Sequence, residues 1–411
     1  MTKKSSTPAI RFKGFTDTWE QRKLDTITDV RDGTHDSPQY AETGHPFITS
    51  KNVKDGFINY EDIQYVSDKD YEEINKRSKV DKNDILMGMI GTIGNIALVR
   101  ETPDFAIKNV ALIKDIGDVY YRYLYHCLQS NSVAHQLDEN LDGGTQKFIA
   151  LNKIREIVIP VPSEHEQHKI GDYMESLDNI ITLHQRKYDN LTNVKKSMLE
   201  KMFPKNGSSV PEIRFKGFSD AWEQRKLGDV SDIVGGGTPS TAITEYWDGD
   251  IDWYAPAEIA DQIFVNSSQR KITTEGLNNS SAKMLPVGTV LFTSRAGIGK
   301  TAILTKEGCT NQGFQSIIPH KDELDSYFIF TRTDELKRYG ETIGAGSTFV
   351  EVSGKQMANM TISIPTTMEE QRQIGIYFRS LDNLITLHQR ELEKLKNLKK
   401  ACLEKMFVLV E

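Results

Sequence analysis

The sequence predicts a mixed α/β (α+β) protein: two α/β domains in pseudo-twofold arrangement, separated by two long repeated helices packed as an antiparallel coiled coil. Three observations predict it, namely the length, a long internal repeat, and an apolar seam on each of two helical segments. A chain of 411 residues exceeds what one hydrophobic core usually organises, so at least two domains are expected. The expected boundaries are 1–160 for the first domain, 161–203 for the first long helix, 204–210 for a linker, 211–365 for the second domain and 366–411 for the second long helix.

The internal repeat has two parts. The segment Pro8–Leu24, PAIRFKGFTDTWEQRKL, returns at Pro211–Leu227 as PEIRFKGFSDAWEQRKL, with three differences in seventeen positions. A helical segment, Ile170–Phe203, returns in the same way at Ile374–Phe407. The chain therefore alternates constant and variable segments, as expected of a duplicated protein with pseudo-twofold symmetry.

Each repeated helical segment carries its own start signal and apolar seam. Ser163–Glu166 and Thr367–Glu370 fit capping boxes, in which the hydroxyl accepts from the third helical N–H and the Glu reaches back to the cap. A helix of about 40 residues spans roughly 60 Å and cannot be buried alone, so the two seams are expected to pack on each other. The interface residues, at three- and four-residue spacing, are Leu177, Ile181, His184, Tyr188, Leu191, Met198, Leu381, Ile385, His388, Leu392, Leu395 and Cys402.

The variable stretches, 25–159 and 228–364, are expected to be mixed sheets and helices. In each, a short apolar run (Ile85–Met87 or Val290–Phe292) precedes a glycine-rich turn and a second apolar run, which predicts a hairpin presenting a loop. Two polar runs, DGTHDSP from Asp32 and GGGTPS from Gly235, predict further loops at matching depth in the two halves. Loops held by a rigid scaffold are common recognition sites.

Composition limits the class of protein. The apolar fraction of 38% suffices for packed cores, and the net charge of −7 argues against a protein that coats DNA through excess Lys and Arg, although local basic loops remain compatible with DNA binding. The three cysteines, Cys127, Cys309 and Cys402, form no CxxC pair and are interpreted as buried apolar residues. Without a long apolar run or signal peptide, a cytoplasmic protein with no membrane partner is expected.

Several segments resemble catalytic motifs but lack a residue or spacing that the chemistry requires. Gly297–Thr301 resembles the end of a phosphate-binding loop, but Ser294 stands where the first glycine is required. His165–His168 lacks the spacing that lets two histidines share a helical face around zinc. There is no Asp/Asn-Pro-Pro-aromatic segment of amino-methyltransferases and no nuclease metal motif. We therefore expect neither catalytic residues nor a metal site.

The constant segments resemble those of a known family. The two WEQRKL segments, the helix starts with Glu166-Gln167 and Glu370-Gln371, and the LEKMF helix ends together resemble the specificity subunit of Type I restriction-modification enzymes. GGGTPS, SRAGIGKTAIL, TNQGFQSI and GTQKF look like stretches found in its target-recognition domains.

This resemblance implies a non-catalytic subunit of a DNA adenine methyltransferase and restriction endonuclease complex of host defence. Each variable domain would be a target-recognition domain that reads one half of a bipartite, asymmetric target in double-stranded DNA. The helices would dock two methylation subunits, and the full nuclease would add two restriction (motor-nuclease) subunits. S-adenosylmethionine, ATP and magnesium would belong to those partners, and no cofactor is expected in this chain.

Polar side chains near the glycine turns are the candidates for DNA contact. Arg bonds guanine bidentately and Gln bonds adenine, whereas a Lys at the same place also suits a phosphate. The candidate DNA-binding residues are Lys51, Asn52, Thr92, Asn95, Gln146, Lys147, Ser294, Arg295, Lys300, Gln312, Gln315 and Ser347.

Two other classes of function remain open from the sequence. One is a scaffold whose coiled coil and variable domains bind proteins, which salt-sensitive binding of double-stranded DNA would distinguish. The other is an enzyme with unrecognised catalytic residues, which methyl transfer by the purified chain alone would reveal.

Overall fold

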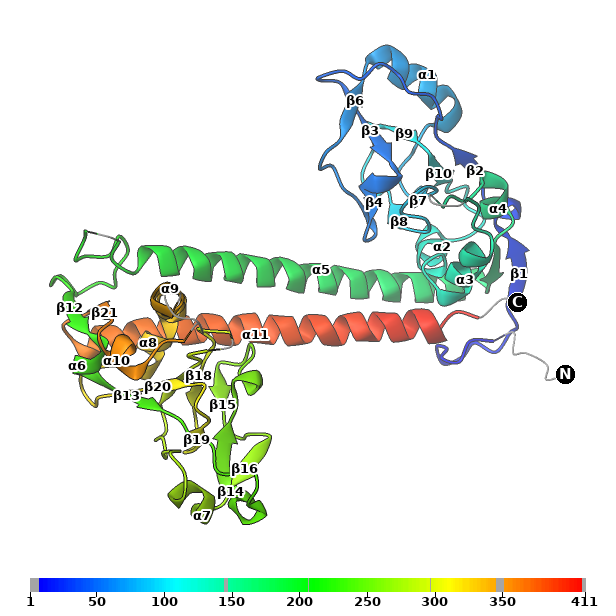
Figure 1. Ribbon diagram of the computed structural model, residues 1–411. Coiled ribbons are helices and arrows are strands. Elements are labelled where there is room, and N and C mark those ends of the chain that lie inside the picture. Colours follow the sequence, from blue (N-terminus) through cyan, green and yellow to red (C-terminus); the bar gives the residue numbers. More distant parts are fainter. Residues whose placement is uncertain (1–6, 144–146, 206, 296, 345–350, 409–411) are drawn as a thin grey trace. The chain divides into compact units, whose positions relative to one another are not determined.

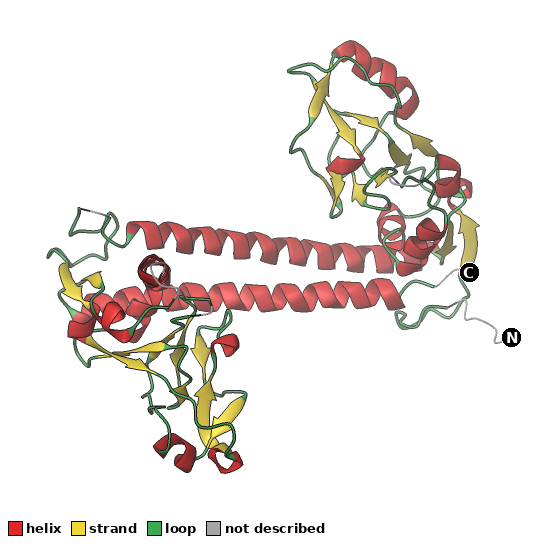
Figure 2. Ribbon diagram, viewed as in Figure 1, coloured by secondary structure: helices red, strands yellow, loops and turns green. Residues whose placement is uncertain are grey.

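The computed structural model divides the chain into two compact units. By their contacts, the first unit comprises residues 1–186 with 389–411, and the second comprises 187–388. Both contain helices and short strands, so the expected mixed α/β class is confirmed (Figure 1, Figure 2). The residues described are 7–143, 147–205, 207–295, 297–344 and 351–408.

The first unit is built on a four-stranded antiparallel sheet in the order β2-β10-β7-β8. Every residue of β7, β8 and β10 is buried, which explains why their sequences (ILMG, IAL, VALI) are apolar without alternation. A second sheet has the order β6-β3-β9, with β3 parallel to β9. The strands are β2 (Val30–Asp32), β3 (His45–Thr49), β4 (Val53–Lys54), β5 (Phe57–Ile58), β6 (Gln64–Val66), β7 (Ile85–Gly88), β8 (Ile96–Leu98), β9 (Ala106–Lys108) and β10 (Val110–Ile113). The helices are η1 (Leu24–Thr26), η2 (Ser50–Asn52), α1 (Asp68–Ser78), α2 (Tyr121–Cys127), α3 (Asn131–Glu139) and α4 (Leu151–Arg155).

The second unit has the same strand order, extended by one strand: β13-β20-β17-β18-β15. Its three-stranded sheet, β16-β14-β19, repeats the parallel pairing, between β14 and β19. Two stretches that align only in fragments therefore share one topology. The strands are β13 (Ser231–Gly235), β14 (Trp247–Tyr254), β15 (Phe264–Val265), β16 (Arg270–Ile272), β17 (Val290–Phe292), β18 (Thr301–Leu304), β19 (Cys309–Thr310) and β20 (Gln315–Pro319). The helices are α6 (Leu227–Val230), η3 (Thr244–Tyr246), η4 (Pro256–Glu258), α7 (Thr274–Asn278), α8 (Ser326–Thr331), α9 (Thr333–Gly344) and α10 (Gly354–Ala358).

The repeated WEQRKL segments close each variable domain with a two-stranded ladder. In the first unit β1 (Glu20–Lys23) pairs antiparallel with β11 (Val158–Val161). In the second, β12 (Glu223–Lys226) pairs in the same way with β21 (Thr361–Ile364). Each variable stretch thus leaves and rejoins the constant part at one ladder.

The helix-start glutamates do not act as the expected capping boxes. The Glu166 carboxylate is fully buried and accepts hydrogen bonds from Arg11 Nε (2.6 Å), Arg11 Nη2 (2.7 Å) and Trp19 Nε1 (3.1 Å). The predicted reach of the glutamate back to the cap was wrong, because two donors from the distant constant segment reach the carboxylate. The hydroxyl half of the prediction is confirmed at the second helix, where the Glu370 N–H donates to Thr367 Oγ1 at 3.4 Å. In the second unit Glu370 likewise accepts from Arg214 (2.7 and 2.8 Å) and Trp222 (3.3 Å).

The glutamine that follows each of these glutamates forms a hydrogen bond to the backbone of the variable stretch. Gln167 Oε1 accepts from the backbone N–H of Tyr120 (2.8 Å), and Gln371 Oε1 accepts from that of Asp325 (3.0 Å). Each Glu-Gln pair therefore fastens one helix to both the constant segment and the variable domain.

The two long helices, α5 (Glu164–Lys201) and α11 (Met368–Lys405), are each 38 residues long. Within the first unit, Lys399 of α11 forms an ion pair with Asp178 of α5 at 2.7 Å. Within the second, Lys195 of α5 pairs with Asp382 of α11 at 2.5 Å. In each unit the last half of one helix thus contacts the first half of the other, as in an antiparallel pair. All twelve predicted interface residues are buried or half-buried, and one continuous coiled coil stays a prediction.

The three cysteines are buried and unpaired, as expected. They lie in the apolar cores, where burial raises the pKa of the Cys127 thiol to about 12. Within the described ranges, no helix combines the length and the apolar character needed to cross a membrane.

Candidate nucleic-acid interface

A glycine turn projects from the main sheet of each unit. β7 pairs antiparallel with β8, and β17 pairs antiparallel with β18, so both predicted hairpins are confirmed. Gly94 and Gly299 have φ of +78° and +94°, a backbone region that favours glycine. Each donates its N–H across the base of its turn, to the carbonyl of Gly88 and of Thr293 respectively. The next residues along the chain, Asn95 and Lys300, are therefore equivalent, and both are exposed.

The structure gathers several first-unit candidates around this turn. Thr92 is half-buried and its hydroxyl donates to the carbonyl of Ser50 (2.6 Å), which holds the turn against the η2 segment carrying Lys51. Lys51 is exposed, with its ammonium group donating to the Asp62 carbonyl at 3.1 Å. Lys147 is also exposed and precedes Phe148, which bridges to the same hairpin at Ile90. Lys51, Asn95 and Lys147 are thus the first-unit candidates presented to solvent.

In the second unit the hairpin contacts the loop before β20. The Ser294 N–H donates to the Gly313 carbonyl at 2.8 Å, and Thr293 bridges to Phe314. Gln312 is exposed in that loop and accepts a hydrogen bond from the Thr238 hydroxyl of the GGGTPS run. Arg295 and Gln315 are half-buried. Lys300 and Gln312 are thus the second-unit candidates exposed to solvent, and Arg295 is half-buried in the same hairpin turn as Lys300.

Two candidates are internal, and we withdraw them from the interface. Asn52 is 2% exposed; its Oδ1 accepts from the Thr49 N–H (3.0 Å) and its Nδ2 donates to the Asn59 carbonyl (3.1 Å), so its amide stabilises a turn. Ser294 is completely buried. Neither side chain can reach a DNA base in this conformation. Gln146 and Ser347 lie outside the described residues.

The two polar loops identified in the sequence lie tightly against neighbouring backbone. A Cβ added at Gly33 would be 2.4 Å from the Ile107 carbonyl oxygen, and one at Gly236 would be 2.0 Å from that of Asn311. Ordinary Cβ contacts are never that short, so both positions require glycine. The glycines of DGTHDSP and GGGTPS therefore fix the position of each loop.

Three further cations of the second unit are each held by a neighbouring side chain. Arg270, in β16, places its guanidinium carbon 3.7 Å from the centre of the Trp247 ring. Lys271 and Lys306 bind Asp252 at 3.4 and 2.8 Å. Burial acts to raise the pKa of Asp252, but bonds from Lys306, the Ser268 N–H and Lys271 lower it to about 2. Arg270 and Lys271 are adjacent in the sequence, and neither lies in a glycine turn.

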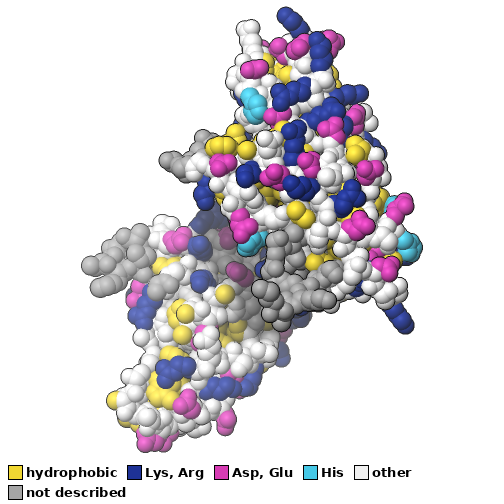
Figure 3. All heavy atoms as spheres, turned by 90° about the vertical axis from the view of Figure 1, so that its right-hand side faces the viewer, with side chains coloured by type: hydrophobic (Ala, Val, Ile, Leu, Met, Phe, Trp, Pro, Cys, Tyr) yellow, Lys and Arg dark blue, Asp and Glu magenta, His cyan; other side chains and the backbone are white. Residues whose placement is uncertain are grey.

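On the one face that Figure 3 shows, the described Lys and Arg side chains form no continuous basic surface. On the face shown in Figure 3, Lys and Arg side chains lie among Asp and Glu side chains. This agrees with the net charge of −7. On that face, phosphate contacts would come from individual cations rather than from a broad positive patch.

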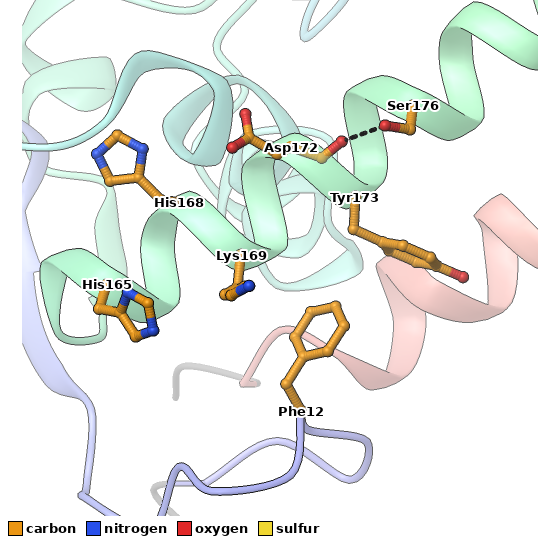
Figure 4. Close-up of a pocket in the computed structure, with 7 residues that line it drawn as sticks. All are labelled: Phe12, His165, His168, Lys169, Asp172, Tyr173 and Ser176. Carbon is orange, nitrogen blue, oxygen red and sulfur yellow. Dashed lines mark hydrogen bonds between the residues drawn. The ribbon is translucent and has the colours of Figure 1, made fainter.

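A surface hollow of about 460 Å³ lies beside the first turns of α5 (Figure 4). His168 stacks on Tyr120 with ring centroids 3.8 Å apart, and His165 contacts Phe15 at 5.5 Å. His165 thus contacts the repeated constant segment, whereas His168 contacts Tyr120 of the variable stretch. The hollow lies away from the glycine turns, and we assign it no role in DNA contact.

Comparisons with known proteins identify relatives of both halves. The family described as "Type I restriction modification DNA specificity domain" matches twice, at residues 16–193 and 219–397. The specificity subunit of the Type I restriction enzyme MjaIX of Methanocaldococcus jannaschii is 35% identical over 190 residues, which are 46% of this chain and 44% of that protein. The chain therefore spans less than half of that relative.

Other relatives match the chain along most of its length. The putative MjaX specificity subunit of the same organism is 24% identical over 93% of this chain and 91% of that protein. The crystal structure of a Type I restriction-modification S subunit from M. genitalium superposes with a TM-score of 0.68, covering 98% of this chain and 99% of that one at 14% identity. That similarity concerns the fold.

Proposed function

Because the chain belongs to the Type I restriction-modification DNA specificity family, we propose that each variable domain reads one half of a bipartite, asymmetric target in double-stranded DNA. One observation carries the proposal. The two units repeat one strand order and one hairpin geometry, but place Asn95 in one turn and Lys300 in the other. A shared framework with different loop side chains suits two different half-sites, because side-chain identity determines which base edges are read.

The long helices are the proposed docking surface for two methylation subunits. Each unit exposes an apolar triplet at equivalent repeat positions of its long-helix segments. In the first unit the triplet residues are 43%, 51% and 43% exposed, and in the second they are 43%, 52% and 41% exposed. Two copies of one exposed pattern fit two copies of one partner. The triplets are Ile180, Leu183 and Leu398 in the first unit, and Leu384, Leu387 and Val194 in the second.

Methyl transfer and DNA cleavage belong, in this proposal, to the partners. The methylation subunits would hold S-adenosylmethionine, and the two restriction subunits would use ATP and magnesium. This chain would contribute sequence recognition alone, without a cofactor.

The test is a methylation map of a host genome in which the chain is expressed with its methylation subunits. A single two-part, asymmetric adenine motif, methylated only when both the chain and the methylation subunits are present, would support the proposal. Methylation of an undivided site, or methyl transfer by the purified chain alone, would contradict it. Salt-dependent binding of a duplex carrying the motif provides an independent check.

A further inference from the structure

A buried histidine in the first unit lies between two carboxylates of α5. His126, in α2, is completely buried, and among the described residues neither ring nitrogen has a hydrogen-bond partner. Its Nε2 is 4.0 Å from Glu175 Oε2, and its Nδ1 is 4.0 Å from Asp178 Oδ2. Ligand atoms from the three side chains lie within 4.8 Å of one another. A buried polar group is normally satisfied, so this arrangement requires an explanation.

The carboxylates differ in their other contacts. Asp178 Oδ1 pairs with Lys399 at 2.7 Å. Glu175 Oε2 is buried, has no hydrogen bond to any described residue, and lies 3.5 Å from Arg100 Nη2. The second unit repeats the Asp–Lys pair as Asp382 and Lys195. That pair is therefore part of the common framework of both units.

The other two members are particular to the first unit. The repeat places Arg379 where the first unit has Glu175. The matching contacts of Tyr120 and Asp325 place Thr331 where the first unit has His126. The imidazole and the second carboxylate are therefore not required by the fold shared by the two units.

We propose that His126 and Glu175 bind one divalent transition-metal ion, with Asp178 positioning the imidazole. An imidazole nitrogen and a carboxylate oxygen are ligands for ions such as Zn²⁺, at about 2.0–2.2 Å each. Two atoms 4.0 Å apart can be bridged by one ion with small movements. Metal-binding histidines usually donate their other ring N–H to a carboxylate, and Asp178 Oδ2 faces Nδ1 for that purpose.

The charged groups around the site determine its affinity for the metal ion. Burial lowers the pKa of His126, and Lys399 and Arg100 lower it further. The same two cations compete with the ion for the carboxylates. The ion would loosen the 3.5 Å contact of Arg100 while Lys399 keeps Asp178 Oδ1.

The experiment is titration of the full chain with Co²⁺ alone, followed by the visible absorption of the bound ion, with competition by Zn²⁺. We expect the chain to bind one equivalent of Co²⁺ through nitrogen and oxygen ligands, and Zn²⁺ to displace it. His126→Gln and Glu175→Gln should each weaken binding more than about 100-fold, and Asp178→Asn about 10- to 100-fold, the range for an orienting partner. Asp382→Asn breaks the equivalent ion pair of the second unit and should leave Co²⁺ binding unchanged.

A second control distinguishes binding at the buried site from binding of Co²⁺ by exposed side chains. His135 and Glu139 form an exposed pair, 3.4 Å apart, and His135→Gln should not change the tight equivalent. If the His126→Gln protein does not fold, the Glu175→Gln protein still tests the proposal. Glu175 lies within the long helix α5, which this substitution should leave folded. Absence of a saturable equivalent, or a signal that survives Glu175→Gln, overturns the proposal and leaves water as the partner of the imidazole.

Discussion

At the scale of single residues, the Arg–Glu–Trp cluster at the start of each long helix explains why the constant segment is repeated. In the first unit, Glu166 is completely buried and its side chain bonds Arg11, which is 12% exposed, and Trp19. A buried carboxylate is tolerated only when it is paired and hydrogen-bonded. The cluster therefore makes folding of the helix start depend on the segment more than 140 residues earlier.

The first prediction concerns this cluster. Glu166→Gln leaves the Arg11 guanidinium without its charged partner, so the free energy of unfolding should fall by about 3–5 kcal/mol, the usual cost of removing one member of a buried pair. Urea denaturation of the chain measures it. Glu20→Gln is the matched control, because the Glu20 side chain is 76% exposed and 4.0 Å from Arg22. Equal stabilities of the two variants would mean that the cluster contributes nothing.

The second prediction separates base contact from phosphate contact on one hairpin. Arg295→Ala should weaken binding by about 1–3 kcal/mol and relax the preference at one base position, as loss of a bidentate guanine contact does. Lys300→Ala, in the same turn, should weaken binding to all sequences alike and lower the salt slope by about one. Binding measured on a panel of single-base variants at several salt concentrations distinguishes them. An Arg295→Ala protein with unchanged affinity and preference would exclude Arg295 from the reading site.

The sequence could predict which loops carry candidate residues. It could not predict which of their side chains form hydrogen bonds within the loop and are therefore not available to DNA. Asn52 and Lys51 are neighbours in a polar turn, yet the Asn52 amide caps that turn and Lys51 is exposed. Glu166 has the spacing of a capping box, but its actual partners are separated from it by more than 140 residues. Local patterns cannot exclude long-range donors, because the competing contact forms only when distant segments pack.

At the scale of elements, the long helices are the part that the sequence predicted best. Their start signals, the three- and four-residue spacing and the break after the first helix are all local, and local signals determine helix bounds. The ion pairs between the helices, Lys399 with Asp178 and Lys195 with Asp382, follow from the same repeat. They were not predicted, because the register of two helices depends on how their side chains interdigitate.

The third prediction uses two leucines one helical turn apart in α11. Leu395 packs against the first core, whereas Leu398 is 43% exposed. Leu395→Asp puts a charge against apolar neighbours and should lower the free energy of unfolding by about 2 kcal/mol or more. Leu398→Asp should change stability by less than about 0.5 kcal/mol but weaken binding of a methylation subunit. Thermal unfolding and co-purification give the two readouts, and a Leu398→Asp protein that assembles normally would contradict the docking proposal.

At the scale of the whole molecule, the duplication makes each variable stretch a unit bounded by one ladder. In the first unit the Leu24 N–H donates to the Ile157 carbonyl at 2.8 Å, immediately beside the β1–β11 ladder. In the second, Leu227 donates to Met360 at 2.8 Å beside the β12–β21 ladder. The common strand order of the two units was not predictable, because the apolar runs that form it are short and shared only in fragments.

The fourth prediction is that these stretches can be exchanged independently. Replacing residues 25–157 with the corresponding stretch of a relative keeps both strands of the β1–β11 ladder and the Arg11–Glu166 pair, so the chimera should fold and assemble. It should methylate a motif in which one half-site is new and the other is unchanged. Replacing residues 228–360 instead should change only the other half-site, which makes each chimera the control for the other. Methylation maps of hosts expressing each chimera with the same methylation subunits give the answer. An exchange that changes both half-sites, or neither, in a chimera that still assembles would show that recognition is not divided between the two variable domains.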